Sequence, residues 1–231
     1  MKQFLIFLVF TLCTTVVFAQ EITSKIVDSL YKEDQFYIGT TYNLINNKPA
    51  GLKQNSFSLG FHLGFIKDMP INKRRNKAIG VGLGYSTNSY IQNMLINKDN
   101  TGNNTYDIID GTTINYSKNK FSEHVLEVPI EFRWRTSTAS SYRFWRIYTG
   151  VKMGYVFSNR SKFIGDLGDL KYNNIEEYND FQYGLTLSVG YNTWNLYIYY
   201  GLNPVFSDSA KINGETLEMN AVKIGLMFYI L

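Results

Sequence analysis

The sequence alternates between large apolar residues and other residues at period two, and it does so in eight separate runs. Within each run, the alternating positions that share the apolar face carry no charged residue. Successive side chains of a strand point to opposite faces, so each run describes a strand with one apolar face. The runs cover residues 36–44, 57–65, 79–85, 126–134, 145–157, 181–191, 194–202 and 222–230. A chain with 16% aromatic residues and only four prolines suits long strands, so we expect an all-β fold.

The opposite face of these strands carries mainly glycine, with a few charged and polar side chains. A soluble barrel would place the apolar face inside and a surface rich in Lys, Glu and Thr outside. A narrow eight-stranded lumen, in contrast, has room for glycine and a few paired charges. A single Arg or Lys facing the lipid at mid-bilayer costs roughly 2–4 kcal/mol, and none of the eight runs places one on its apolar face. The pattern therefore predicts an eight-stranded antiparallel up-and-down transmembrane β-barrel over residues 35–231.

The connections between the runs predict an orientation. The second, fourth and sixth connections are short, whereas the third, fifth and seventh are long and polar. The first connection is the one odd-numbered connection that is short. Short connections are typical of the periplasmic end of an outer-membrane barrel. Trp134, Trp145 and Trp194 lie beside the short connections on the apolar face, and Trp prefers the membrane interface. We expect them to form a periplasmic aromatic girdle, with both termini in the periplasm. The expected long loops are residues 91–121, 158–180 and 203–218, and the short connections are 67–77, 136–142 and 192–193.

The first 19 residues have the pattern of a secretory signal peptide, with a positive start, an apolar run and Val17-Phe18-Ala19 before the expected cleavage site. The apolar run is too short for a transmembrane anchor. Residues 20–34 would form a periplasmic N-terminal segment, either a short amphipathic helix or a plugging tail. The single cysteine, Cys13, lies in the signal, so the mature chain excludes a disulfide framework.

Charged residues on the glycine-rich face predict a polar network inside the lumen. If Trp134 is opposite Trp145, the register places Glu127 opposite Lys152 and Glu131 opposite Tyr148. The network could serve as an ion path or proton-sensitive plug, or it could simply fill the lumen; we favour filling because buried charges need partners. Pro129 cannot donate a ladder hydrogen bond, so we expect a bulge there. The expected network is Glu127, Glu131, Arg133, Arg146, Tyr148, Lys152 and Lys223.

No motif for catalysis or for a cofactor is present. Adjacent residues of a strand point to opposite faces, so Ser122, Glu123 and His124 cannot form a triad by themselves. The loop carboxylates Asp107, Asp110, Asp166 and Asp169 match no calcium-loop spacing. There is no P-loop, dinucleotide fingerprint or zinc spacing. We therefore expect a non-enzyme without a cofactor or metal.

The charge gives no indication of a nucleic-acid partner, whereas the apolar strand faces predict contact with outer-membrane lipid. The formal net charge of +4 is too small to indicate nucleic-acid binding. The second connection is basic and would either touch anionic headgroups or a periplasmic partner, or be merely solvated. Its basic residues are Lys73, Arg74, Arg75 and Lys77.

Residues 126–157 resemble the PorT-like outer-membrane β-barrel family of Bacteroidota; they read LEVPIEFRWRTSTASSYRFWRIYTGVKMGYVF. Residues 57–66 and 79–85 resemble the second and third strands of that family. The final VKIGLMFYIL is similar to an outer-membrane assembly signal, although it ends on Leu231 rather than on an aromatic residue. The resemblance implies an OmpA-like eight-stranded barrel. The family's named member is an accessory of type IX secretion and gliding motility, and many other members have no assigned role. The resemblance also implies protein partners in the outer membrane or periplasm, and no catalytic residues.

Two functional hypotheses follow. The first is a non-enzymatic integral outer-membrane barrel with a structural or complex-forming role beside a secretion machine. The second is a passive porin-like channel for small solutes, which would need a continuous wet lumen, whereas eight-stranded barrels are normally filled by side chains.

Overall fold

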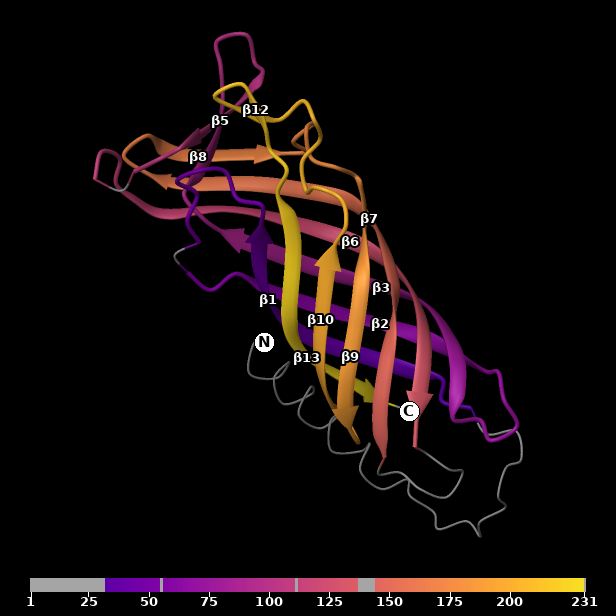
Figure 1. Cartoon of the computed structure of the whole chain (residues 1–231). Coiled ribbons are helices and arrows are strands. Elements are labelled where there is room, and N and C mark those ends of the chain that lie inside the picture. Colours follow the sequence, from indigo (N-terminus) through magenta and orange to yellow (C-terminus); the bar gives the residue numbers. More distant parts are fainter. Residues whose placement is uncertain (1–31, 55, 111, 137–143, 231) are drawn as a thin grey trace, which may run out of the picture.

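The computed structural model describes residues 32–54, 56–110, 112–136 and 144–230. The expected signal peptide, and all but residues 32–34 of the expected N-terminal segment, lie outside the described residues. The described part contains strands and no helix, and accordingly no helix long and apolar enough to cross a bilayer (Figure 1). The eight long strands are β1 (Gln35–Asn46), β2 (Leu59–Pro70), β3 (Lys77–Ile91), β6 (Tyr116–Arg135), β7 (Trp145–Gly165), β9 (Phe181–Tyr191), β10 (Trp194–Gly201) and β13 (Asn220–Ile230). The five short strands are β4 (Met94–Lys98), β5 (Asn104–Ile108), β8 (Gly168–Asn173), β11 (Lys211–Ile212) and β12 (Glu215–Thr216).

The long strands form a closed barrel. Their order is β6-β3-β2-β1-β13-β10-β9-β7, and pairing of β6 with β7 closes the ring. All of these pairs are antiparallel, and the first and last strands of the chain are neighbours. The predicted eight-stranded antiparallel barrel is therefore confirmed.

The barrel is apolar outside and polar inside, the reverse of a water-soluble barrel. Leu83, on the outer face, is 65% exposed, whereas the inward Lys152 and Arg133 are 5% and 0% exposed. Each large apolar side chain left in water would forfeit about 1.5–3 kcal/mol of burial free energy, a cost that lipid contact removes. The outer face is thus suited to hydrocarbon, as the alternation predicts.

Glycines of the inner face make room for large lumen side chains. Gly64 and Gly84 pair with each other on β2 and β3, and the ring of Tyr37 lies directly over them. A Cβ atom at Gly64 would lie 2.6 Å from that ring, and one at Gly84 would collide with the Tyr37 hydroxyl. These glycines therefore allow a tyrosine to fill the lumen, which explains part of the glycine-rich face.

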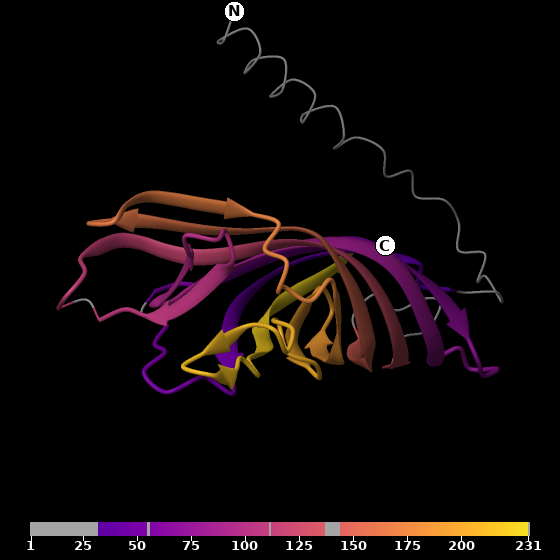
Figure 2. The same ribbon diagram turned by 90° about the horizontal axis from the view of Figure 1, so that it is seen from above.

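The long connections contain more strand than we predicted. Residues 91–121 include the β4–β5 hairpin and the start of β6, and residues 158–180 include the end of β7 and all of β8. Residues 203–218 hold the small β11–β12 hairpin. Figure 2 shows β6, β7 and β8 continuing together beyond the barrel to one side. We call this three-stranded projection, residues 116–122, 158–165 and 168–173, the β6–β7–β8 extension.

The predicted register between β6 and β7 is wrong by two residues. Trp134 pairs with Ile147 rather than Trp145, and Glu127 pairs with Gly154 rather than Lys152. Likewise Arg133, not Glu131, is opposite Tyr148. Because side chains repeat every two residues, a two-residue shift leaves every apolar residue on the same face. Alternation therefore cannot distinguish the two registers.

The predicted bulge at Pro129 is also wrong. Pro129 pairs with Lys152 in an unbroken register along β7, and the two shifts between these strands lie instead between His124 and Val125 and between Tyr116 and Lys118. A proline removes one donor but adds no residue, so the register has no need to change. The two-residue turn after β9 is as predicted, and Asn192 there has a φ of 58° that suits a tight hairpin.

Candidate functional site

The charged side chains of the lumen lie in three layers along the barrel. The lower layer, at the end with the short connections, is built on Asp68 near the end of β2. Arg135 binds Asp68 with both guanidinium nitrogens at 2.8 Å, and Arg133 donates to the same carboxylate at 3.2 Å. Arg133 also donates to Glu131 at 3.2 Å and lies over the Tyr148 ring, 4.3 Å from its centroid. The Glu33 carboxylate lies 3.9 Å from Arg135, so two buried guanidinium groups are held by three carboxylates and a ring.

Residues before β1 close this end of the lumen. Arg133 donates to the backbone oxygen of Glu33 at 3.3 Å and to the side-chain oxygen of Gln35 at 2.8 Å. The backbone N–H of Glu33 donates to Asp68 at 3.3 Å. Glu33 and Gln35 are fully buried. The chain entering β1 is therefore part of the lower layer rather than a free tail.

The middle layer is centred on Glu127. Lys152 on β7 lies 2.9 Å from one carboxylate oxygen, and His62 on β2 lies 3.3 Å from the other. The second ring nitrogen of His62 is 3.1 Å from the Thr41 hydroxyl. The ammonium of Lys152 also lies 4.9 Å from the centroid of the Tyr197 ring. Each charge of this layer has an opposite charge or an aromatic face beside it, as burial requires.

The upper layer is centred on Glu123. Its carboxylate accepts hydrogen bonds from Asn88 at 2.9 Å, Gln182 at 2.9 Å and the Tyr178 hydroxyl at 2.5 Å. Lys223 on β13 lies 3.3 Å away. Four donors use the acceptor capacity of the carboxylate. Since Tyr178 belongs to the connection between β8 and β9, this layer also ties a loop over the upper end of the lumen.

Little space remains between the lower and middle layers. A cavity between the lower and middle layers has a volume of about 10 Å³, enough for about one water molecule. A solute on this route would have to displace buried, ion-paired side chains. The cavity is lined by Tyr37, Ile66, Pro129, Glu131, Lys152, Tyr197, Met227 and Tyr229.

The predicted lumen residues all point inward, but they do not form one network. Glu127 and Lys152 meet in the middle layer, diagonally rather than directly opposite. Lys223 belongs to the upper layer and pairs with a carboxylate that we did not include. Arg146 lies over the Phe144 ring, with its guanidinium carbon 4.4 Å from the ring centroid. The other three predicted residues, Glu131, Arg133 and Tyr148, meet in the lower layer.

Several residues of the lumen were not among those predicted from the sequence. Glu123 is the most consequential, because it organises the upper layer. It shares the parity of Glu127, but the apolar alternation ends at Leu126, so Glu123 was read as part of a rim. Asp68 and Arg135 share the parity of the neighbouring inward residues in the same way. Inward positions recur at every second residue, and extending this spacing beyond the last apolar residue of each strand predicts all three as inward.

Aromatic side chains mark both rims of the outer face. Trp145 and Trp194 are exposed at the end with the short connections, and Trp134 is partly buried there. Trp194 packs edge-on against Phe228, with ring centroids 4.8 Å apart. The other rim carries Tyr85, Tyr155, Phe157 and Phe181.

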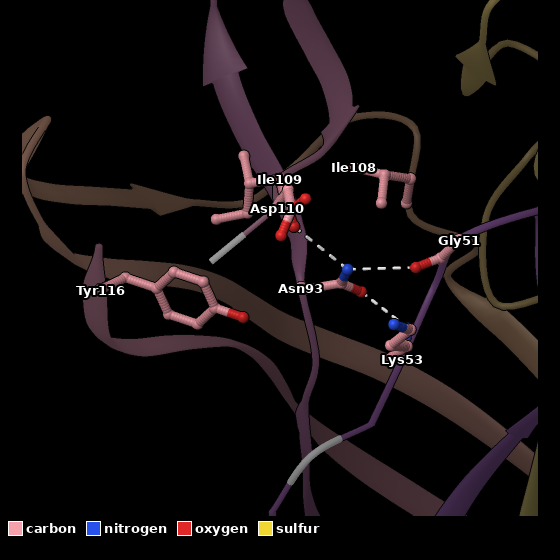
Figure 3. Close-up of a pocket in the computed structure, with 7 residues that line it drawn as sticks. All are labelled: Gly51, Lys53, Asn93, Ile108, Ile109, Asp110 and Tyr116. Atoms are coloured by element: carbon pink, nitrogen blue, oxygen red, sulfur yellow. Dashed lines mark hydrogen bonds between the residues drawn. The ribbon is translucent and has the colours of Figure 1, made fainter. Parts of the chain in front are cut away.

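A pocket of about 310 Å³ lies outside the lumen, between the β1–β2 connection and the β4–β5 hairpin (Figure 3). Asn93 forms its base: its amide donates to the backbone oxygens of Gly51 and Ile109, both at 3.1 Å, and accepts from the N–H of Lys53 at 2.7 Å. Asp110 lies at the edge, and hydrogen bonds from Thr112 lower the pKa of its carboxyl. The polar groups of Asn93 are therefore used to fasten two loops together.

The three neighbouring rim residues Ser122, Glu123 and His124 point to different faces. Glu123 points into the lumen, whereas His124 lies on the outer face, where its Nδ1 is 2.7 Å from the Tyr85 hydroxyl. Ser122, Glu123 and His124 therefore do not converge. Among the described residues, no group of three or more His, Cys, Asp or Glu side chains is arranged to hold a metal ion.

Comparison with known proteins adds a family. The model of the outer membrane protein beta-barrel domain matches residues 18–207, more than half of the chain. No curated protein matches. Among solved structures, Ail, the attachment invasion locus protein of Yersinia pestis, in complex with the heparin analogue sucrose octasulfate is 13% identical, with a TM-score of 0.42; the match covers 87% of this chain and 99% of that one. Ail without that ligand is 12% identical, with a TM-score of 0.39 over the same shares. Scores this low carry no argument, so the architecture rests on the strand pairing described above.

Proposed function

Because the chain belongs to the outer membrane protein beta-barrel domain family, we propose that it is a non-enzymatic integral outer-membrane barrel with a structural or complex-forming role. One observation carries the proposal: the lumen is filled by three layers of buried, partnered charges. A pore for solutes would need a continuous wet path, whereas the cavity in this lumen holds about one water. The surfaces available for contact with partners are then the rim, the extension and the lipid-facing wall.

The proposal includes an orientation. Both termini and the short connections lie in the periplasm, and the β6–β7–β8 extension lies outside the cell. The supporting features are the three tryptophans beside the short connections and the length of the opposite connections. Residues 1–19 act as the signal peptide, and residues 20–34 lead from the periplasm into the lower layer. The chain contacts outer-membrane lipid and no nucleic acid.

The finer part of the proposal concerns partners. The chain acts as a PorT-like accessory of type IX secretion in a Bacteroidota outer membrane, in contact with other outer-membrane or periplasmic components. Its support is the resemblance over residues 126–157, the hairpin of β6 and β7 from which the extension grows. The extension continues three strands beyond the barrel wall (Figure 2).

Lys152→Met tests the filled lumen. The substitution removes the ammonium from Glu127, so we expect a lower unfolding temperature while the refolded protein stays silent in planar-bilayer recordings. The unmodified protein serves as the matched control. Stable openings of defined conductance in the unmodified protein, or a clear conductance rise in the variant, would favour the channel and contradict the proposal.

Native purification tests the partners. The tagged full chain, extracted in mild detergent, should co-migrate in fixed stoichiometry with secretion components on native gels. The same preparation in a denaturing detergent provides the control. A barrel that migrates alone after mild extraction would remove the complex-forming role and leave a purely structural one.

A further inference from the structure

Three lysines stand directly opposite one another across the β6–β7–β8 extension. Lys120 on β6 pairs with Lys162 on β7, and Lys162 pairs with Lys171 on β8. Like charges directly opposite on neighbouring strands destabilise a sheet. A fold that keeps such a row accepts a cost that an anion on that face would offset.

Two more cations lie on the same face. Lys118 is two residues from Lys120, and Arg160 is two residues from Lys162, so strand alternation places them beside the row. Among the described residues, none of these five has a carboxylate within 4.0 Å. The single acidic residue of β8, Asp169, pairs in register with Ile164 and leaves the cations in excess. Partial burial, together with the charges of Lys118, Lys162 and Arg160, lowers the pKa of Lys120. We call Lys118, Lys120, Arg160, Lys162 and Lys171 the basic face.

The opposite side of the extension is already occupied. Phe163 packs there with Leu95 and Ile109, and Ile114, Tyr116 and Leu170 adjoin this cluster. The basic face is therefore the outward side, continuous along β6 with the lipid-facing Leu126.

The basic face begins just beyond the aromatic rim. Arg160 is three residues after Phe157, about 10 Å along the strand, and Lys162 is about 17 Å along it. With a strand tilt of about 40°, these are heights of about 8 and 13 Å above the rim. Headgroups extend about 5–8 Å beyond the hydrocarbon, and long basic side chains reach toward them. Arg160 thus lies at the level of the polar headgroups, and the lysine row lies just above them, where its long side chains reach toward the phosphates.

We propose that the basic face binds the phosphate groups of phosphorylated glycolipids in the outer leaflet. The inference rests on the proposed outer-membrane orientation. Phosphate fits because lysine ammonium and arginine guanidinium groups donate strong, charge-assisted hydrogen bonds to it. A lipid source fits because the face continues the lipid-contacting wall, where headgroups are already present at high local concentration. Bound phosphates would cancel the repulsion within the lysine row and hold the extension against the membrane surface.

The test measures binding of diphosphorylated lipid A to the refolded full chain in zwitterionic detergent, followed by thermal unfolding. The variant is Lys120→Gln/Lys162→Gln/Lys171→Gln. A matched control, Lys73→Gln/Arg74→Gln/Lys77→Gln, removes the same charge from exposed positions at the other end of the barrel. Each basic residue near an anionic surface raises the binding affinity about fivefold. We therefore expect the lipid A concentration at half-saturation to be roughly 100-fold higher for the variant and little changed for the control. Without lipid A, the variant should be at least as stable as the unmodified chain.

Three results would overturn the inference: equal lipid A binding by the variant, an equal loss in the control, or equal binding of lipid A stripped of phosphate. Inorganic pyrophosphate, added at the same phosphate concentration, is a further arm, and equally tight binding would assign the face to a soluble anion instead. Insertion into vesicles and conductance are recorded on the same samples. A barrel that inserts and is silent, yet binds lipid A regardless of the lysines, overturns this inference alone, whereas a conducting barrel overturns the proposed function alone.

Discussion

The lumen and the β6–β7–β8 extension both contain lysines, but they hold them in opposite ways. Lys152 and Lys223 are buried, and each lies within 3.3 Å of a glutamate oxygen. Lys120 and Lys162 face each other on adjacent strands, at the surface of the extension, and within the described residues no carboxylate forms an ion pair with either. Burial makes an unpaired charge cost several kcal/mol, whereas an exposed one costs little. Pairing in the lumen is thus enforced by the fold, and the row on the extension is not.

This difference separates packing from recognition. A lumen charge with all its hydrogen bonds satisfied has little left to offer a ligand, as the four donors around Glu123 illustrate. The cations of the extension have N–H donors that are available to a ligand. Removing a lumen charge should therefore affect stability strongly and ligand binding little, and changing an extension charge should do the reverse.

The largest expected effect comes from Glu127→Ala. The change leaves Lys152 buried without its carboxylate and also frees His62, so we expect a loss of about 3–5 kcal/mol in the free energy of unfolding. Urea unfolding from lipid vesicles measures it. Adding Lys152→Met to the same chain should restore much of the loss, because no uncompensated ammonium then remains. A loss below about 1 kcal/mol in the single variant would mean that the middle layer is hydrated, against the filled lumen.

Glu123→Gln should have a smaller effect. Glutamine keeps one acceptor oxygen but turns an amino group either toward the donors of Asn88 and Lys223 or toward those of Tyr178 and Gln182. In both orientations it leaves Lys223 without a counter-charge. We expect about 2–3 kcal/mol less stability. Because Tyr178 ties its loop to this carboxylate, hydrogen exchange of residues 174–180 should also quicken.

Glu123→Asp gives the matched control for that loop, since it keeps the charge and shortens the side chain. Unchanged exchange in Glu123→Gln would show that the loop is held by its own contacts, such as Tyr178 against Phe206, whose ring centroids are 5.1 Å apart.

The barrel was predictable from sequence because lipid imposes a simple rule on one face of every strand. The outward apolar positions of β9 and β10, for example, repeat without a break. The lumen obeys no such rule: Glu123 and Glu127 lie on one strand and one face, yet they serve different layers. Their partners come from strands distant in sequence, and a two-residue register shift changes those partners without changing any face.

The extension was missed for a related reason. Its outer side lies beyond the apolar wall, so Lys120 and Lys162 occupy the face that is apolar lower on the same strands. The inward residues, such as Phe163, are the apolar ones there. On β6 the alternation continues with its polarity inverted. On β7 the register skips Phe157, so the residues that face outward change from odd to even numbers there. A search for one fixed pattern therefore reads both segments as loops.

The smallest expected effect, and the one with opposite sign, belongs to Lys162→Glu. The change turns two like-charge pairs, with Lys120 and Lys171, into two opposite-charge pairs. In zwitterionic detergent at low salt we expect the extension to gain about 0.5–1 kcal/mol, measured as slower hydrogen exchange of residues 158–173. Lys162→Gln only removes the repulsion, so its exchange rate should lie between those of the unmodified chain and Lys162→Glu. Added salt should reduce the differences in exchange rate among the three chains. When diphosphorylated lipid A is added, the order should reverse, because phosphate stabilises the lysine row and is repelled by glutamate. An order that stays the same with and without the lipid would mean that the row meets no anion there, and the contrast between lumen and extension would then be one of burial alone.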